Sequence, residues 1–206
     1  MFSLPSPDPG IEISAFSQGM SKGLRQTEGV QILVRPEVAV GTLFAGGYYK
    51  NVTSPTADGE AALMIGLRRH FAGFDLAVSS AYKWNTGART QADRNAFEFN
   101  ATASRHFGRV TPRISLTYSP DDLGGTRASL YAEAGATVNL FAGASVSANV
   151  ARRSRDGGPD YTAFNAGATY AITPNLSADL RYYDTAQSRL GVIYEPRLVV
   201  SARLHF

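Results

Sequence analysis

Apolar and polar residues alternate with a period of two along most of the chain. In the clearest segment Phe74, Leu76 and Val78 share one face, while Asp75 and Lys83 share the other. Such alternation indicates half-buried β-strands and is incompatible with a helix. The pattern predicts twelve strands: residues 10–19, 29–40, 42–51, 60–70, 73–85, 95–107, 110–119, 126–138, 142–153, 161–172, 175–184 and 196–206.

The connections between these strands alternate between long and short. Those after odd-numbered strands are long and polar, as in residues 120–125 and 154–160, whereas those after even-numbered strands are tight, as around Gly41. Long loops at one end and tight periplasmic turns at the other are typical of outer-membrane barrels. We therefore predict an all-β fold, a transmembrane up-and-down antiparallel β-barrel. It occupies residues 10–206, after a flexible tail of residues 1–9.

The strand count has one alternative. Twelve strands of about ten residues leave roughly seven residues for each connection, which suits a barrel of this length. Ten strands are the alternative, because the first strand and residues 29–51 alternate poorly and include Pro36 and the pair Gly46 and Gly47.

The last predicted strand ends on an aromatic residue. Leu198, Val200, Ala202, Leu204 and Phe206 are apolar, and polar residues separate most of them. A terminal phenylalanine on the apolar face is typical of the last strand of an outer-membrane barrel. We expect Phe206 to act as an assembly signal for the barrel-assembly machinery.

Alternation alone does not say which face points outward, because a soluble ligand-binding barrel has the same period. The apolar face carries runs of small residues, such as Ala132, Ala134 and Ala136, which would fill a wide barrel poorly. Large aromatic residues, among them Tyr82 and Trp84, gather near strand ends, as in the two aromatic girdles of a membrane barrel. These features favour lipid on the outside.

Composition narrows the possibilities further. The 206 residues include no cysteine, which excludes disulfides and thiolate metal sites. No apolar stretch is long enough for a membrane-spanning helix. The first ten residues lack the pattern of a signal peptide, so we expect an export signal to be absent from this chain. A net charge of +3 is too small and scattered to indicate a nucleic-acid partner.

Two regions resemble a known family. Residues 22–29 with residues 43–52, and residues 161–170 with residues 175–185, resemble the TorF-family porins of bacterial outer membranes. The chain departs from that family at residues 16–18 and at Arg25. The resemblance implies an outer-membrane barrel and says little about the solute.

Candidate chemistry is sparse. His70, His106 and His205 fall at the predicted periplasmic ends of three strands that are not neighbours, so we interpret them as interfacial histidines near turns. Barrel hydrolases hold a histidine at the outer rim, and none is predicted there, so we expect neither an enzyme nor a catalytic residue. We also predict no metal site and no cofactor. Aspartates 121 and 122 suggest turn chemistry, and arginines 152, 153 and 155 suggest a solvated run at the outer rim.

The informative set is the polar face, which would line the lumen. Its charges have mixed sign with a slight basic excess, which in an open pore would favour anions weakly. The predicted pore-lining residues are Glu12, Arg35, Arg68, Asp75, Lys83, Glu98, Arg113, Arg127, Glu133, Asp179, Arg181 and Arg203, with Glu37 and Arg197 in the same phase.

We therefore predict a porin-like channel in a Gram-negative outer membrane, with lipid, lipopolysaccharide and small solutes as partners. The channel would pass small hydrophilic solutes by diffusion. One alternative is a non-conducting barrel with a paired ionic core, serving a structural or surface-interaction role. The other is a soluble barrel that binds an apolar ligand. The sequence leaves open whether residues 19–28 fold outward or into the pore.

Overall fold

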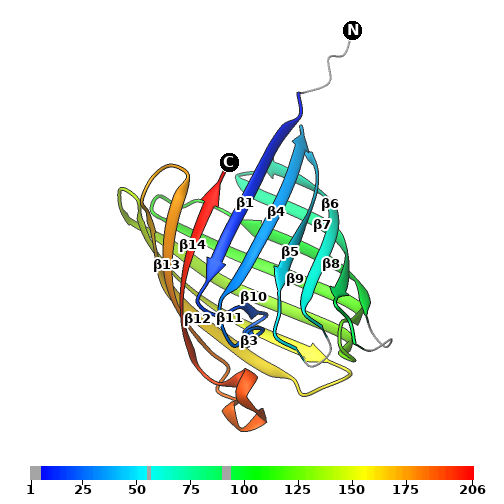
Figure 1. The fold of residues 1–206 in the computed structure, drawn as a ribbon. Coiled ribbons are helices and arrows are strands. Elements are labelled where there is room, and N and C mark those ends of the chain that lie inside the picture. The colour runs from blue at the N-terminus through cyan, green and yellow to red at the C-terminus, as the bar shows by residue number, and fades with distance from the viewer. Residues whose placement is uncertain (1–5, 55–56, 90–93) are drawn as a thin grey trace.

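The computed structural model describes residues 6–54, 57–89 and 94–206. Within these residues, twelve antiparallel strands close into one barrel, and β1 pairs with both β4 and β14 to complete the ring (Figure 1). The barrel strands are β1 (Asp8–Phe16), β4 (Gln31–Val40), β5 (Leu43–Asn51), β6 (Gly59–Phe71), β7 (Phe74–Thr86), β8 (Asn95–Ser104), β9 (Val110–Asp122), β10 (Arg127–Phe141), β11 (Ala144–Arg155), β12 (Tyr161–Ala171), β13 (Leu176–Asp184) and β14 (Arg197–His205). The predicted twelve-stranded barrel is confirmed, and the ten-stranded alternative is wrong.

Four short elements complete the described fold. They are β2 (Met20–Ser21), β3 (Leu24–Arg25), η1 (Ser188–Leu190) and η2 (Val192–Tyr194). Among the described residues, no helix has the length and apolar character needed to cross a membrane. Of the predicted flexible tail, residues 1–5 lie outside the described residues, and β1 itself begins at Asp8.

Turn chemistry explains the tight end of the barrel. Between β6 and β7, Ala72 and Gly73 have φ values of 51° and 80°, and Phe71 pairs with Phe74 across them. Positive φ at both central residues defines the type I′ turn, whose twist matches that of antiparallel strands. β1 begins and β14 ends at this end, and the long connections lie at the other (Figure 1). By the membrane-barrel convention, the tight end is periplasmic.

The apolar face of the barrel points outward. On β6 the side chains of Leu63, Ile65 and Leu67 are 63%, 60% and 47% exposed, while the alternate residue Glu60 is buried inside. A continuous apolar belt of this kind faces acyl chains rather than water. The alternative of a soluble barrel that holds an apolar ligand is therefore wrong, because its apolar residues would have to line the interior.

Aromatic residues lie on this outer face near the strand ends. Towards the extracellular end, the ring of Tyr82 lies 5.9 Å from that of Trp84 and 5.1 Å from that of Phe97. Phe71, at the periplasmic end, is exposed. These positions match the predicted aromatic girdles.

Candidate functional site: the barrel interior

The first long connection folds into the barrel as a small hairpin. Its strands β2 and β3 pair Met20 with Arg25 and Ser21 with Leu24, which leaves Lys22 and Gly23 as the two turn residues. We call residues 20–25 the inner hairpin. It lies in the half of the barrel away from the periplasmic turns (Figure 1). The open question about residues 19–28 is thus answered for residues 19–27, which turn inward, whereas Glu28 is exposed.

The turn of the inner hairpin needs its glycine. Lys22 and Gly23 have φ values of 49° and 81°, the positive pair of a type I′ turn. A Cβ on Gly23 would overlap the Cβ of Ala163 on β12. Only glycine therefore combines this backbone conformation with so close an approach to the barrel wall.

Hydrogen bonds attach the base of the hairpin to its surroundings. The backbone N–H of Gln26 donates to the carbonyl of Gly19 at 2.7 Å, and Thr27 Oγ1 accepts from the N–H of Gly19 at 2.7 Å. Lys50 Nζ on β5 donates to Gln26 Oε1 at 2.7 Å, and the N–H of Thr53 donates to the carbonyl of Gln26 at 2.8 Å. The two chain segments at the base of the hairpin are thereby bonded to each other and to β5 and the residues that follow it.

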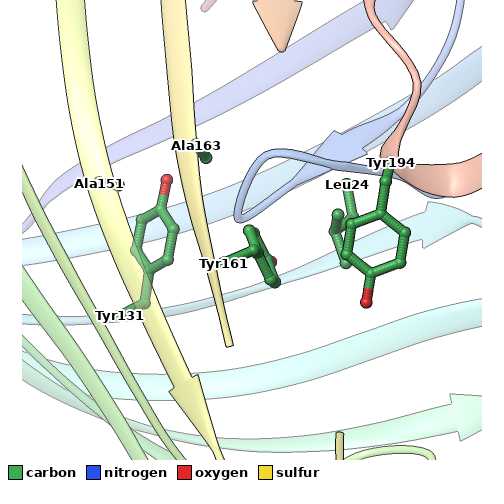
Figure 2. Packing of buried hydrophobic residues seen from close by; sticks show 6 residues of the cluster. All are labelled: Leu24, Tyr131, Ala151, Tyr161, Ala163 and Tyr194. Carbon is green, nitrogen blue, oxygen red and sulfur yellow. The ribbon is translucent and has the colours of Figure 1, made fainter. Parts of the chain in front are cut away.

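An apolar cluster inside the barrel holds the other side of the hairpin. Figure 2 shows Leu24 beside Tyr194, with Tyr161 between them and Tyr131. The rings of Tyr161 and Tyr194 meet edge to face with centroids 5.5 Å apart. Tyr161 is fully buried, and its hydroxyl donates to the carbonyl of Lys22 at 2.7 Å. A segment of the last outer connection thus packs on the inner hairpin.

Charges fasten the tip of the hairpin to the opposite wall. Lys22 Nζ lies 2.7 Å from Glu98 Oε2 and 2.8 Å from Asp122 Oδ2. Lys83 Nζ binds the same two carboxylates at 2.7 and 2.9 Å, and Arg153 Nη2 donates to Asp122 Oδ2 at 2.9 Å. All five side chains are largely shielded from solvent. We call them the tether network; it holds three cations and two anions.

The inner hairpin lies between two cavities of the interior. The outer cavity, of about 360 Å³, includes Ser54 and Leu123 from the extracellular connections. The inner cavity, of about 460 Å³, is lined by barrel residues such as Arg113 and Arg203. Lys22 lines both cavities. The arrangement is that of a constriction inside a polar tube.

Most of the predicted pore-lining residues lie inside the barrel and pair with one another. Glu12 lies 3.6 Å from Arg203, Asp179 lies 3.0 Å from Arg181, and Arg68 pairs with Glu37. Further predicted residues in interior ion pairs are Lys83, Glu98, Arg113 and Glu133, whereas Asp75 contacts the imidazole of His70. Their role in conduction stays a prediction.

Three predicted residues stand apart from these interior pairs. Arg35 takes part in none of the ion pairs seen among the described residues. Arg127, the first residue of β10, is exposed at the outer rim with a φ of 57°, where the β9–β10 register shifts. Arg197 pairs with Glu195 at 2.7 Å near the outer end of β14.

Of two interpretations from the sequence, one is incomplete and one is wrong. Asp122 does accept the N–H of Leu123 at 3.0 Å at the start of a turn, but it also lies buried among three cations. Arg153 does not belong to a solvated run, since it faces inward while Arg152 faces outward and pairs with Asp160 at 3.2 Å. The period-two alternation of β11 could have predicted that Arg153 faces inward. No alternation in the sequence indicates the inward hairpin that brings Lys22 to Asp122.

Tyr48 lies on the inner face of β5 rather than in a girdle. Its hydroxyl donates a hydrogen bond to Glu60. It therefore adds a polar group to the outer cavity, which it lines.

The histidines lie at the periplasmic end, as predicted, but His70 and His106 contact the same carboxylate, that of Asp75. His70 Nδ1 and His106 Nε2 lie 2.9 and 3.5 Å from the two carboxylate oxygens of Asp75. His205 lies 3.9 Å from Glu12. Within the described part of the chain, no group of three or more histidines and carboxylates is arranged to hold a metal ion.

Phe206 closes the barrel seam. Its N–H donates to the carbonyl of Ile11 at 3.0 Å, its own carbonyl accepts from the N–H of Ile11 at 3.2 Å, and its side chain is 68% exposed. An assembly role for this side chain stays a prediction.

Comparisons with known proteins agree with this geometry. Among solved structures, a KdgM porin matches with a TM-score of 0.66 at 7% identity, covering 96% of this chain and 99% of the other. A NanC porin matches with a TM-score of 0.61 at 9% identity, covering 95% and 97% of the two chains. An outer membrane channel from Pseudomonas putida F1 matches with a TM-score of 0.57 at 11% identity, covering 100% and 97%. At these identities the likeness shows the fold alone.

The family assignment comes from the comparison of the sequence with family models. No curated protein matches the chain. The model of the Gram-negative porin family matches residues 26–194, which is most of the sequence. The finer TorF assignment rests on the sequence resemblance alone. The chain is an outer-membrane β-barrel that belongs to the Gram-negative porin family.

Proposed function

We propose that this porin passes small hydrophilic solutes by passive diffusion, with a weak preference for anions. The observation that carries the proposal is the pair of polar cavities on either side of the inner hairpin. Barrels of this strand number lie between small, side-chain-filled barrels and wide porins. A tube of this width narrowed by one hairpin suits solutes of low mass.

The charge around both cavities supports the preference for anions. Basic side chains outnumber acidic ones around each cavity, so the local potential attracts anions. The bases at the outer cavity are Lys22, Arg25, Lys50, Lys83, Arg153 and Arg155, and the acids are Glu60, Glu98 and Asp122. The inner cavity has Lys22, Arg113, Arg181 and Arg203 beside the single acid Glu133. Because many of these bases are already paired, we expect a modest preference.

A reversal-potential measurement tests the selectivity. Detergent-folded protein, with folding verified by its gel mobility with and without heating, is inserted into a planar bilayer under a potassium chloride gradient. We expect a reversal potential of the sign set by chloride, and a smaller one in Lys83→Met. A potential of the sign set by potassium in the wild type would contradict the proposed preference.

A second candidate is a non-conducting barrel with a structural or surface-interaction role. The observation that favours it is the tether network, since Lys22 and Lys83 both bind Glu98 and Asp122 across the interior. Paired charges in a narrow barrel can close it. Verified folded barrels that give no current steps would favour this candidate over the channel.

The finer assignments belong to the same proposal. We propose membership in the TorF-family porins, lipopolysaccharide at the outer rim and the barrel-assembly machinery as partners, and no catalytic role. The resemblance in residues 22–29 and 161–170 supports the first assignment. The terminal Phe206 on the apolar face supports the link to assembly. Sequence comparison restricted to TorF members would test the first, and the Phe206 substitution described below tests the last.

A further inference from the structure

Three arginines stand on the outer surface at the periplasmic rim. Arg69 continues the outward phase of β6, Arg105 follows β8, and Arg109 lies in the turn before β9. We call them the rim arginines. Among the described residues none of the three takes part in an ion pair, in contrast to interior arginines such as Arg113 and Arg181. Within the described part of the chain, this basic group at the membrane interface therefore has no acidic side chain as an ion-pair partner.

Phenylalanine rings support two of the rim arginines. The guanidinium carbon of Arg105 lies 5.1 Å from the ring centroid of Phe74 and 4.9 Å from that of Phe107. That of Arg69 lies 6.0 Å from the ring of Phe71. Cation–π contacts hold a guanidinium against a ring and leave its N–H edge available to an anion. The arginines are thus oriented on the surface.

The strand ladder makes these residues neighbours. Phe71 pairs with Phe74 between β6 and β7, and Phe107 bridges to Val110 next to Arg109. Arg109 Nη1 donates to the carbonyl of Leu140 at 3.2 Å, which extends the group to the end of β10. The rim arginines therefore form one strip over five adjacent strands.

The acidic residue Asp75, at the same rim, does not neutralise the strip. It lies on the inner face of β7, where His70 and His106 contact its carboxylate. On the outer face, the strip continues into the apolar belt, which on β6 is formed by Leu63, Ile65 and Leu67. The strip therefore combines a positive edge with an apolar wall, the two parts of a phospholipid site.

We propose that the rim arginines bind the phosphate headgroups of anionic glycerophospholipids in the periplasmic leaflet. A guanidinium donates two parallel hydrogen bonds to a phosphate, and charge assistance strengthens both. The acyl chains of the same lipid lie along the apolar belt. The binding does not depend on whether the barrel conducts.

Native mass spectrometry of the detergent-folded barrel tests this proposal. The protein is mixed with phosphatidylglycerol or with phosphatidylcholine of the same acyl chains, and the bound lipid is counted. We expect phosphatidylglycerol to bind preferentially. The variant Arg69→Gln/Arg105→Gln/Arg109→Gln should lose on the order of 100-fold in relative affinity, because each arginine near an anionic lipid contributes about fivefold.

Arg152→Gln is the matched control, because Arg152 also faces outward but lies at the opposite rim and pairs with Asp160. It should retain the wild-type preference. The single variant Arg109→Gln, in an exposed turn, gives a smaller loss in the same direction if the triple variant does not fold. Equal binding of both lipids, or equal losses in the control and the rim variants, would overturn the proposal.

Discussion

Lys22 is the residue whose loss should most clearly release the inner hairpin. Lys22→Ala removes two charge-assisted contacts, to Glu98 at 2.7 Å and to Asp122 at 2.8 Å. Both carboxylates keep Lys83 as a partner, so the loss is that of the two hydrogen bonds and no charge is left uncompensated. Hydrogen bonds to charged groups contribute about 1.5–3 kcal/mol each, and we take about 3 kcal/mol for the two together. That change shifts the ratio of released to docked hairpin by about 100-fold.

The assay is single-channel recording from folded protein in a planar bilayer. A released hairpin leaves a wider lumen, so we expect longer dwell times in a state of higher conductance. The ratio of dwell times in the high and low states should rise by about 100-fold relative to the wild type. Lys22→Arg, which keeps the charge, should stay close to the wild type.

Arg25→Gln is the control, because it also removes a positive charge from the hairpin but breaks no contact of the tether network. Arg25 lies in the same hairpin, and its ion pair with Glu28 spans 3.9 Å to a side chain that is 74% exposed. Arg25 itself is only 16% exposed, but a pair at this distance with a solvent-exposed partner contributes about 0–1 kcal/mol. The reasoning is refuted if Lys22→Ala leaves the dwell-time ratio unchanged, or if Arg25→Gln changes it as much.

The remaining predictions concern the turn, the selectivity and the assembly of the barrel. Gly23→Ala should also release the hairpin and lengthen the dwell times in the high-conductance state, because alanine is strained at a φ of 81°. Gly29→Ala, with open space around it, should not. Equal dwell times in the two variants would contradict this prediction. Glu98→Gln should move the reversal potential further towards chloride and Lys83→Met towards potassium, and shifts of the opposite sign would count against the charge argument. Phe206→Ser should lower the amount of folded barrel in cellular outer membranes while the purified chain still folds in detergent; normal folded yield in cells would exclude an assembly role.

Much of the fold follows from local rules in the sequence. Alternation sets which side chains share a face, and pairs such as Ala72 and Gly73 set the tight turns. Both act over a few residues, so the strands and their order could be predicted. The outward direction of the apolar face followed from small and aromatic residues on that face.

The interior arrangement could not be predicted in the same way. The inner hairpin has only two residues in each strand, too few to show a period. Its docking depends on contacts far apart in sequence, since Glu98 and Asp122 lie 76 and 100 positions from Lys22. No local pattern encodes such pairs, and this is why the sequence indicates only the turn role of Asp122.

The most direct test of the account compares single-channel conductance in the wild type and in a variant whose inner hairpin, residues 20–25, is replaced by a short glycine linker. Both proteins are first shown to be folded by their gel mobility with and without heating. The account predicts discrete steps in the wild type and larger steps in the variant. Absence of steps in both folded proteins, or equal steps in the two, would contradict a channel that is narrowed by this hairpin.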